Sequence, residues 1–514
     1  MKPVKTLLFF VVVMVILLFI MLVFPEKGIT ITQDVALEFP TVQNFFNEKN
    51  NKPDTNSVLA SLEIPDDNDE DSVFVEVVQV DTIQEDNQFK EYVPRPIAID
   101  SIRQELELPS SGLQCLNTIF SALSSADDLQ SLIRILHYGD SQIETDRITG
   151  YLRYKLQAQF GGSGPGLIPA QTAYNYKSPL EVVNSGTWKR YTIFPKIDTT
   201  ITHYRYGVLA SFSMLSPPVV IPKTPDEDTA YIQNFMDDLL HPEDREVYTG
   251  SIKFVHSNVT RANVKLIKQI RMFYGNCKEK FSVKVSDGEN ILYSDSISPS
   301  EYYSVKKWTF AESPKDLQME FSGTQSPEIY GFAMDGNSGI AVDNIPLRGC
   351  SGTIFTKMNS QFLQSMYKDL HVKCLILQFG GNTVPSLKPE NVHSFKSSFA
   401  AQLRLLRRIC PDMSIIVIGP ADMSTKNMDN YETYEVLPMV VEDLRQAAFE
   451  NDCAFWDMYS AMGGQNTMPD WVFHEPPLAE KDFVHFTPQG ANVIAKMFYN
   501  AFIGCYNRYL SKNK

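Results

Sequence analysis

The sequence predicts an α/β fold with a doubly wound parallel sheet, an inserted β-sandwich domain and an N-terminal transmembrane helix. Short apolar runs alternate with amphipathic stretches on both sides of a long middle section. That section consists of short segments in which apolar and polar residues alternate. An unbroken apolar run follows Lys5. Strands that alternate with helices form parallel sheets covered on both faces. The ligands of such sheets lie beyond the carboxyl ends of the strands.

Length and composition narrow the classes of function. A chain of 514 residues is expected to hold two or three domains. The formal net charge of −15 argues against a nucleic-acid partner, since phosphate binding needs clustered Lys and Arg. The seven cysteines include no CxxC pair, and neither HExxH nor a close His pair occurs, so we expect no metal and no cofactor. The pairing of the cysteines stays open.

The first 27 residues predict a cytoplasmic tip and a membrane anchor. Leu7 to Phe24 is about long enough to cross a bilayer. Lys2 and Lys5 precede it, so the positive-inside rule places the rest of the chain outside, in the periplasm or at the cell surface. A cleaved signal peptide is the alternative, but no A-x-A-like site follows the run.

Residues 28–96 are acidic and poor in aromatic side chains, which is typical of a solvated tether. Within them, "VFVEVVQV" at 73–80 is compatible with an edge strand docked on the catalytic body.

Residues 97–175 and 329–514 carry the α/β pattern. The expected strands are 132–138, 373–379, 414–420 and 453–458, and the expected helices are 143–160, 392–408, 437–450 and 488–502. Thr487 is the expected N-cap of the last helix, with Pro488 at its first position.

Residues 176–328 predict the inserted β-sandwich. Segments such as "SIKFVHS" and "FSVKVSDGENILYSDSIS" are short, alternating and bounded by turns. The one long helix expected within the insert is 229–240.

Ser141 follows the first expected strand at a tight turn, in "HYGDSQ". A serine hydroxyl becomes a nucleophile when a histidine, itself oriented by a carboxylate, takes its proton. Among eight histidines, His485 stands out because Asp482 lies three residues before it and both precede the last helix. His137 is expected to be a core histidine, and His474 part of a loop. The final glycine of a GxSxG motif is missing, which disfavours an α/β-hydrolase.

Two further segments predict donors for an oxyanion. "LRGCSGTIF" places Gly349 and Gly352 after a strand-like run, where backbone N–H groups point outward. "LQFGGNTVP" places the Asn382 amide after a buried strand. Both fall where a parallel sheet binds its ligands.

The four segments, in this order, resemble the motif blocks of the SGNH (GDSL-type) hydrolases, a family with a flavodoxin-like fold. The resemblance implies that Ser141 is the nucleophile and that its backbone N–H is an oxyanion donor. It implies that Gly352 and Asn382 are two more oxyanion donors. Asp482 would be the catalytic acid and His485 the catalytic base. The third block departs from the family pattern, because Thr383 follows the asparagine.

Longer stretches, including "IYGFAMDGNSGIAVDNIPLRGCSG", resemble the peptidoglycan O-acetylesterases, which carry a β-sandwich between the first two blocks. The resemblance implies removal of acetyl groups from the C6 hydroxyl of muramic acid, with the acetylated glycan held in part by the insert. Two alternatives stay open: an acetyltransferase that uses the same triad, and a glycan-binding envelope protein without catalysis. Neither the oligomeric state nor a protein partner is indicated.

Overall fold

The computed structural model describes residues 29–32, 35–37, 104–125, 132–174, 179–217, 245–256, 261–427 and 430–512. The chain divides into two compact units, residues 1–72 and 73–514. In the first, β1 (Ile29–Thr32) and β2 (Val35–Leu37) form a hairpin inside the stretch expected as a tether. The anchor expected at 7–24, the segment 73–80 and the helix expected at 229–240 lie outside the described residues. No helix in the described part of the chain is long and apolar enough to cross a membrane.

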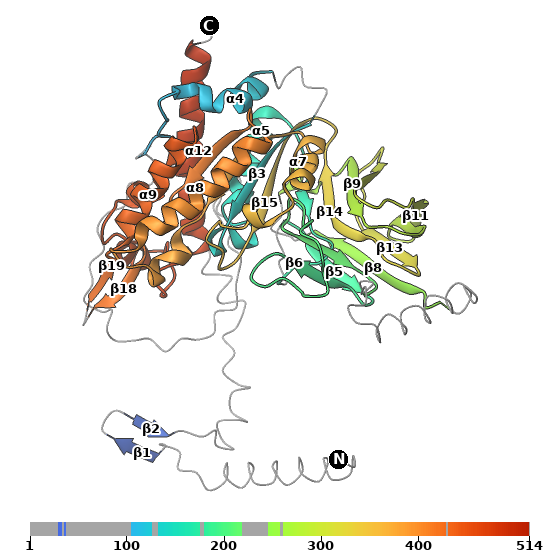
Figure 1. Cartoon of the computed structure of the whole chain (residues 1–514), viewed down its shortest axis with the longest axis horizontal. Helices are drawn as coiled ribbons and strands as arrows, with labels where there is room; N and C mark the ends of the chain where they lie inside the picture. The colour runs from blue at the N-terminus through green and yellow to red at the C-terminus, as the bar shows by residue number, and fades with distance from the viewer. Residues whose placement is uncertain are drawn as a thin grey trace, which may run out of the picture. The chain divides into compact units, whose positions relative to one another are not determined.

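Five parallel strands form the central sheet of the α/β part, in the order β15-β3-β16-β17-β20 (Figure 1). Their bounds are β3 (Leu132–Gly139), β15 (Gly339–Pro346), β16 (Val372–Gln378), β17 (Ser414–Ile418) and β20 (Ala454–Trp456). Four of them are the expected strands. The strand-like run before Gly349 is the fifth, the edge strand β15, which pairs with β3.

Helices cover both faces of this sheet, as the near-continuous apolar strands require. Leu136 and Tyr138 of β3 face one core, while Ile133 and Ile135 face the other, because successive side chains of a strand alternate. The first core is closed by α7 (Ser360–Asp369), α8 (Val392–Ile409) and α9 (Leu437–Glu450), and the second by α4 (Asn117–Ser124), α5 (Thr149–Phe160) and α12 (Pro488–Lys512). The doubly wound sheet is therefore present.

The helix expected at 143–160 is divided in the structure. A 3-10 helix (Ser141–Asp146) precedes α5, because Glu144 is extended (ψ 157°) and Thr145 and Asp146 have positive φ. At the last helix, Gly490 N donates to Thr487 Oγ1 at 3.1 Å, so Thr487 caps α12 as expected. Two short helices, α10 (Met458–Met462) and α11 (Met468–Val472), lie between β20 and α12.

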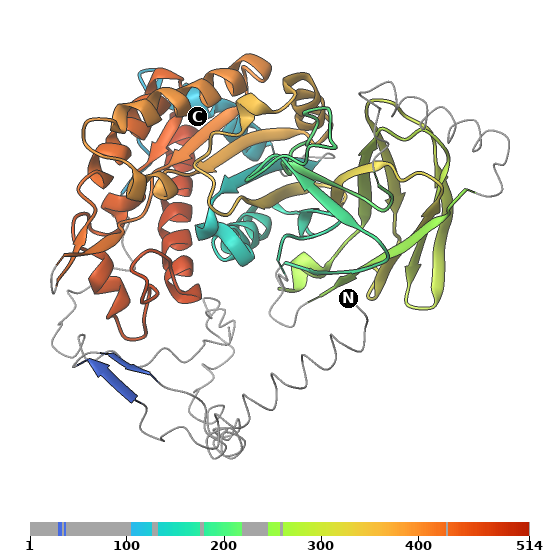
Figure 2. The same ribbon diagram turned by 60° about the horizontal axis from the view of Figure 1, so that its bottom comes forward.

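The insert consists of two antiparallel sheets around a core of their own, which includes Trp308, Phe321 and Phe332. One sheet is β11-β10-β13-β8-β5, with bounds β5 (Glu181–Ser185), β8 (Tyr248–Val255), β10 (Phe281–Asp287), β11 (Asn290–Ile297) and β13 (Leu317–Gly323). The other is β12-β9-β14-β7-β6, with β4 also paired to β14, and its bounds are β4 (Gly166–Ile168), β6 (Lys189–Thr192), β7 (Ser211–Met214), β9 (Gln269–Gly275), β12 (Ser304–Thr309) and β14 (Glu328–Asp335). Both views show these strands on one side of the α/β layers (Figures 1 and 2).

Strand pairing sets wider limits for the insert than the expected 176–328. β4 and β14 pair with each other inside the second sheet, so the insert runs from 166 to 335. The sequence pattern missed these ends because both strands are uniformly buried and lack the polar alternation used to recognise the others. The 3-10 helix at 141–146, α5 and the insert together form the connection from β3 to its neighbour β15.

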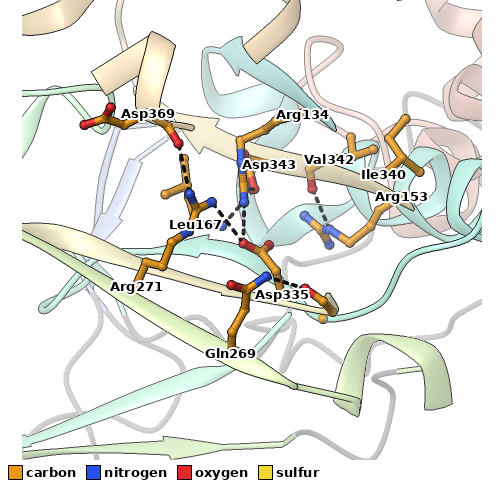
Figure 3. A network of polar contacts seen from close by, with 12 residues as sticks. Arg134, Arg153, Leu167, Gln269, Arg271, Asp335, Ile340, Val342, Asp343 and Asp369 are labelled. Carbon is orange, nitrogen blue, oxygen red and sulfur yellow. Dashed lines mark hydrogen bonds and ion pairs between the residues drawn. The ribbon is translucent and has the colours of Figure 1, made fainter. Parts of the chain in front are cut away.

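A buried ionic network joins the insert to the sheet (Figure 3). Arg134 of β3 donates through Nη1 to both carboxylate oxygens of Asp343 on β15, at 2.6 and 2.7 Å, and through Nη2 to Asp335 of β14. Asp343 Oδ1 also accepts from Leu167 N of β4 at 2.8 Å. All three charged side chains are 0 % exposed, so the network fixes the two parts against each other.

Candidate active site

Ser141 lies at the turn between β3 and the following 3-10 helix, beyond the carboxyl end of the sheet. β3 ends at Gly139, where a Cβ would come within 3.1 Å of the Gln378 carbonyl oxygen of β16. Asp140 caps the turn, because its Oδ1 accepts from Gln142 N at 3.0 Å. Glycine and aspartate together therefore fix the backbone on which Ser141 sits.

Ser141, His485 and Asp482 form one hydrogen-bonded chain. Ser141 Oγ lies 2.8 Å from His485 Nε2, and His485 Nδ1 lies 2.6 Å from Asp482 Oδ2. Each ring nitrogen thus has one partner, which is the arrangement that lets a histidine take a proton from a serine hydroxyl.

Backbone N–H groups hold the Asp482 carboxylate in its ionised form. Burial raises the pKa of Asp482, but hydrogen bonds from the His485 ring and from the backbone N–H groups of His485 and Val484 outweigh it and keep the pKa below its ordinary value. Both N–H groups donate to Asp482 Oδ1 at 2.9 Å. The carboxylate therefore remains available to orient and stabilise an imidazolium.

Two side chains of the serine segment bind the backbone of the histidine loop. Gln142 Nε2 donates to the Val484 carbonyl oxygen at 2.6 Å. Arg147 Nη1 donates to the Phe486 carbonyl oxygen at 3.0 Å. These bonds fix the residues on either side of His485 against the turn that carries Ser141.

A β-hairpin contacts the loop that carries Asp482 and His485, in addition to the contacts from the serine segment. Phe483, between Asp482 and His485, has φ +58°, which is a strained conformation for a bulky residue. The ring of Tyr431 stacks on that of Phe483, with 3.7 Å between centroids and 5° between planes. The Phe483 carbonyl oxygen accepts from Ser424 N at 3.0 Å. Tyr431 and Ser424 belong to the hairpin of β18 (Ser424–Asn427) and β19 (Asn430–Thr433).

Gly352 lies in a tight loop after β15. Its φ is +81°, and a Cβ there would lie 2.8 Å from the Phe379 ring, so a larger residue is excluded. Its N–H donates to Cys350 Sγ at 3.3 Å. Because thiols are weak acceptors, this N–H is engaged only weakly.

The Asn382 amide lies against the residue before Ser141. Its Nδ2 donates to Asp140 Oδ2 at 3.1 Å and to the Cys350 carbonyl oxygen at 3.3 Å. The structure thus brings Asn382 to the serine turn and to the loop of Gly352. The expected donor is already engaged by protein atoms, which the sequence alone did not indicate.

Asp140 is a buried carboxylate at this site that sequence reasoning did not select. Burial raises its pKa to about 6, while the Gln142 backbone N–H and the nearby His485 act in the opposite direction. Its position next to Ser141 in the chain was the signal by which Asp140 could have been selected from the sequence. Gln142, Arg147 and Tyr431 were also missed, since nothing in their local sequence marks long-range contacts.

A cavity of about 180 Å³ lies beside the serine turn, between the α/β part and the insert. Glu144 and Thr145 line it from the 3-10 helix, and 345–348 line it from the end of β15. Leu347 N donates to the Gly139 carbonyl oxygen at 2.8 Å, which joins this wall to the end of β3.

Two other histidines have structural roles, as expected. His137 is fully buried, with Nδ1 2.9 Å from Thr149 Oγ1 and Nε2 3.1 Å from Gln378 Oε1. Burial lowers the pKa of His137 to about 3. His474 Nδ1 lies 2.8 Å from the Pro476 carbonyl oxygen within its own loop.

Comparison with known proteins finds a similarity to one family. The model of the GDSL-like lipase/acylhydrolase family matches residues 322–493, a range that includes Gly352, Asn382, Asp482 and His485 and excludes Ser141. Comparison with curated proteins finds no match.

Solved structures with similar folds include a peptidoglycan O-acetylesterase, with a TM-score of 0.58 and 18% identity over 77% of this chain and 98% of that chain. Weaker likenesses are a family two carbohydrate esterase from Clostridium thermocellum (TM-score 0.22, 9% identity, 50% and 91% of the two chains) and a salicylyl-acyltransferase from a tetracycline biosynthetic pathway (0.25, 9%, 63% and 97%). Residues 322–493 are therefore similar to the GDSL-like lipase/acylhydrolase family, and the chain shares the fold of a peptidoglycan O-acetylesterase.

Proposed function

We propose that the protein is a serine esterase that removes O-acetyl groups from a cell-envelope polysaccharide, with peptidoglycan as the main substrate, through an acyl-serine intermediate. The observation that carries the proposal is the contact of 2.8 Å between Ser141 Oγ and His485 Nε2, with Asp482 on the other ring nitrogen. The peptidoglycan O-acetylesterase of the same fold supports the choice of glycan.

In the acylation step, Ser141 Oγ attacks the acetyl carbonyl carbon while its proton passes to His485 Nε2. The new bond is Oγ–C, and the carbonyl oxygen becomes an oxyanion. Collapse of this intermediate breaks the bond between the acetyl carbon and the sugar oxygen. His485 returns its proton to that oxygen, so the sugar leaves with a free hydroxyl.

In the deacylation step, water attacks the acetyl-serine and gives a proton to His485. The Oγ–C bond then breaks, Ser141 recovers the proton and acetate leaves. Asp482, held ionised by its backbone donors, stabilises the imidazolium in both steps.

The oxyanion is expected to bind the N–H groups of Ser141 and Gly352 and the Asn382 amide. For Gly352, the oxyanion replaces a weak thiol acceptor. For Asn382, it competes with the Cys350 carbonyl oxygen, while the bond to Asp140 keeps the amide beside the serine. The stronger, charged acceptor forms only during reaction, which favours the transition state over the ground state.

We place the catalytic part outside the cytoplasm, anchored by residues 7–24, because Lys2 and Lys5 precede that apolar run. The insert, 166–335, would then help to hold the glycan. This placement is tested by protease accessibility of the chain in intact cells.

Acetate release tests the reaction itself. The full chain in detergent should release acetate from O-acetylated peptidoglycan and none from the same material after mild alkaline de-O-acetylation. If acetyl groups instead appear on added chitooligosaccharide faster than free acetate, the protein is a transferase with the same nucleophile. If neither product forms, the proposed function is wrong.

A further inference from the structure

The histidine segment, residues 484–487, pairs along one side with the residues that precede it in the chain. The His485 carbonyl oxygen accepts from Glu480 N at 2.8 Å. Phe486 forms an antiparallel bridge with Ala479, without direct hydrogen bonds between these two residues. In antiparallel pairing, successive residues direct their backbone groups to opposite sides. The N–H and the carbonyl oxygen of Phe486 therefore point away from this first partner.

On the opposite side, two side chains of the serine segment, residues 141–147, supply the partners. Gln142 Nε2 donates to the Val484 carbonyl oxygen at 2.6 Å, and Phe486 N donates to Gln142 Oε1 at 3.4 Å. Arg147 Nη1 donates to the Phe486 carbonyl oxygen at 3.0 Å and completes the row. Phe486 is fully buried, and buried backbone groups require partners. Gln142 and Arg147 therefore take the place of a neighbouring strand.

Gln142 is itself fixed to the turn of the nucleophile. It directly follows Ser141 in the chain and is only 8 % exposed. Its backbone N–H donates to Asp140 Oδ1 at 3.0 Å. One side-chain amide thus joins the backbone next to Ser141 to the backbone on both sides of His485. The distance of 2.8 Å between Ser141 Oγ and His485 Nε2 depends on this connection.

The pair of Asp482 and His485 is held by other bonds. Asp482 Oδ1 accepts from two backbone N–H groups of its own loop at 2.9 Å, and Asp482 Oδ2 lies 2.6 Å from His485 Nδ1. Phe483, in the middle of that loop, has φ +58°, so the loop is held in a strained conformation. Loss of the Gln142 bonds would let the loop move away from the nucleophile with its carboxylate–imidazole pair intact.

We propose that Gln142 is the positioning residue that sets the distance between the nucleophile and the base. The proposal rests on the proposed function and assigns to one side chain the alignment that proton transfer requires. His485 takes the proton of Ser141 and returns it to the sugar oxygen, so displacement of His485 impairs both transfers. An aryl acetate with a weakly basic nitrophenolate as leaving group needs only the first transfer. Displacement of the base therefore costs more on a sugar ester than on such an aryl ester.

The test compares two substrates, O-acetylated peptidoglycan fragments and para-nitrophenyl acetate, by kcat/KM, which reports the acylation step. Gln142→Met keeps approximately the volume of the side chain and removes its bonds to Val484 and Phe486. On the glycan, kcat/KM should fall about 10²-fold, the cost of a displacement of about 1 Å. On the aryl ester, which needs no proton on its leaving group, the fall should be about 10-fold.

Gln269→Met is the matched control. Gln269 lies on β9 of the insert, is 6 % exposed and donates through Nε2 to the Gly336 carbonyl oxygen at 2.7 Å. The control therefore loses a similar buried bond away from the serine. Both variants should melt below the wild type, since each loses a buried hydrogen bond. Gln269→Met should leave kcat/KM unchanged on both substrates.

Equal losses of Gln142→Met on the two substrates, or no loss on either, would overturn the role of Gln142. If this variant does not fold, Arg147→Met, which removes the third bond of the row, replaces it and must show the same inequality between substrates. Absence of acetate release from the glycan by the wild type would instead refute the proposed function. The loss on the aryl ester would then still test Gln142.

Discussion

The Asn382 amide donates to Asp140 Oδ2 at 3.1 Å and to the Cys350 carbonyl oxygen at 3.3 Å, so a side chain expected to bind an oxyanion is already held by the serine turn. A pre-oriented donor costs little reorganisation at the moment of reaction. The bond to Asp140 links the donor to the nucleophile, since Asp140 and Ser141 are adjacent in the chain.

Asn382→Ala is expected to lower kcat for acetate release by about 10²–10³-fold, the usual cost of losing one oxyanion donor, with little change in KM. Steady-state kinetics on an aryl acetate measures both constants. Asn391→Ala, at an exposed position before α8, is the control. A change confined to KM would contradict a role in the transition state.

Asp140→Asn is expected to alter how stability depends on pH. The pKa of Asp140 is raised from 3.8 to about 6 in the folded protein, so the folded state holds the proton more tightly than the unfolded state. The associated stability is present below about pH 4 and is lost as the pH rises to about 6, by roughly 3 kcal/mol.

Urea unfolding of wild type and Asp140→Asn between pH 4 and 7 measures this loss. The free energy of unfolding of wild type, relative to the variant, should fall over that interval. Parallel curves would show that Asp140 titrates normally.

Tyr431→Leu is expected to lower kcat about 10-fold or more with little change in KM. The stacked ring of Tyr431 supports Phe483 in its strained conformation, and displacement of the loop by about 1 Å moves His485 out of reach of Ser141. Tyr431→Phe keeps the stacking and should retain activity. If Tyr431→Phe loses as much activity as Tyr431→Leu, the hydroxyl and not the stacking is responsible.

Asp343→Ala is expected to destabilise the protein by about 3–5 kcal/mol, because it leaves the fully buried Arg134 without one of its carboxylates. Asp316→Ala removes the half-exposed partner of Lys253 and should cost about 1 kcal/mol or less. Denaturant unfolding of both variants gives the comparison. Equal costs would mean that the network contributes no more than a surface pair.

The local pattern of apolar residues predicted most of the α/β part, because a buried parallel strand and an amphipathic helix each have a recognisable apolar pattern. The strand β3 and the helix α9 were expected almost at their observed bounds. β15 was harder to recognise because it carries Asp343, a polar residue whose burial depends on Arg134, which is distant in the chain. The division of the helix at 143–160 depends on backbone conformations at Glu144, Thr145 and Asp146 that no periodicity reveals.

In the candidate site, too, local sequence signals could be recognised and long-range contacts could not. Ser141, Asp482 and His485 were selected from short motifs, and the structure joins them in one hydrogen-bonded chain. The contacts that hold them, from Gln142 and Tyr431, join segments far apart in the chain and follow only from the fold.

The most direct test of the account is acetate release by Ser141→Ala on O-acetylated peptidoglycan. The account predicts a loss of about 10⁴-fold or more in kcat with an unchanged melting temperature. Acid-quenched wild type should carry one acetyl group on Ser141, and the variant none. The exposed Ser397→Ala should retain full activity. Undiminished acetate release by Ser141→Ala would contradict the central claim that this serine is the nucleophile.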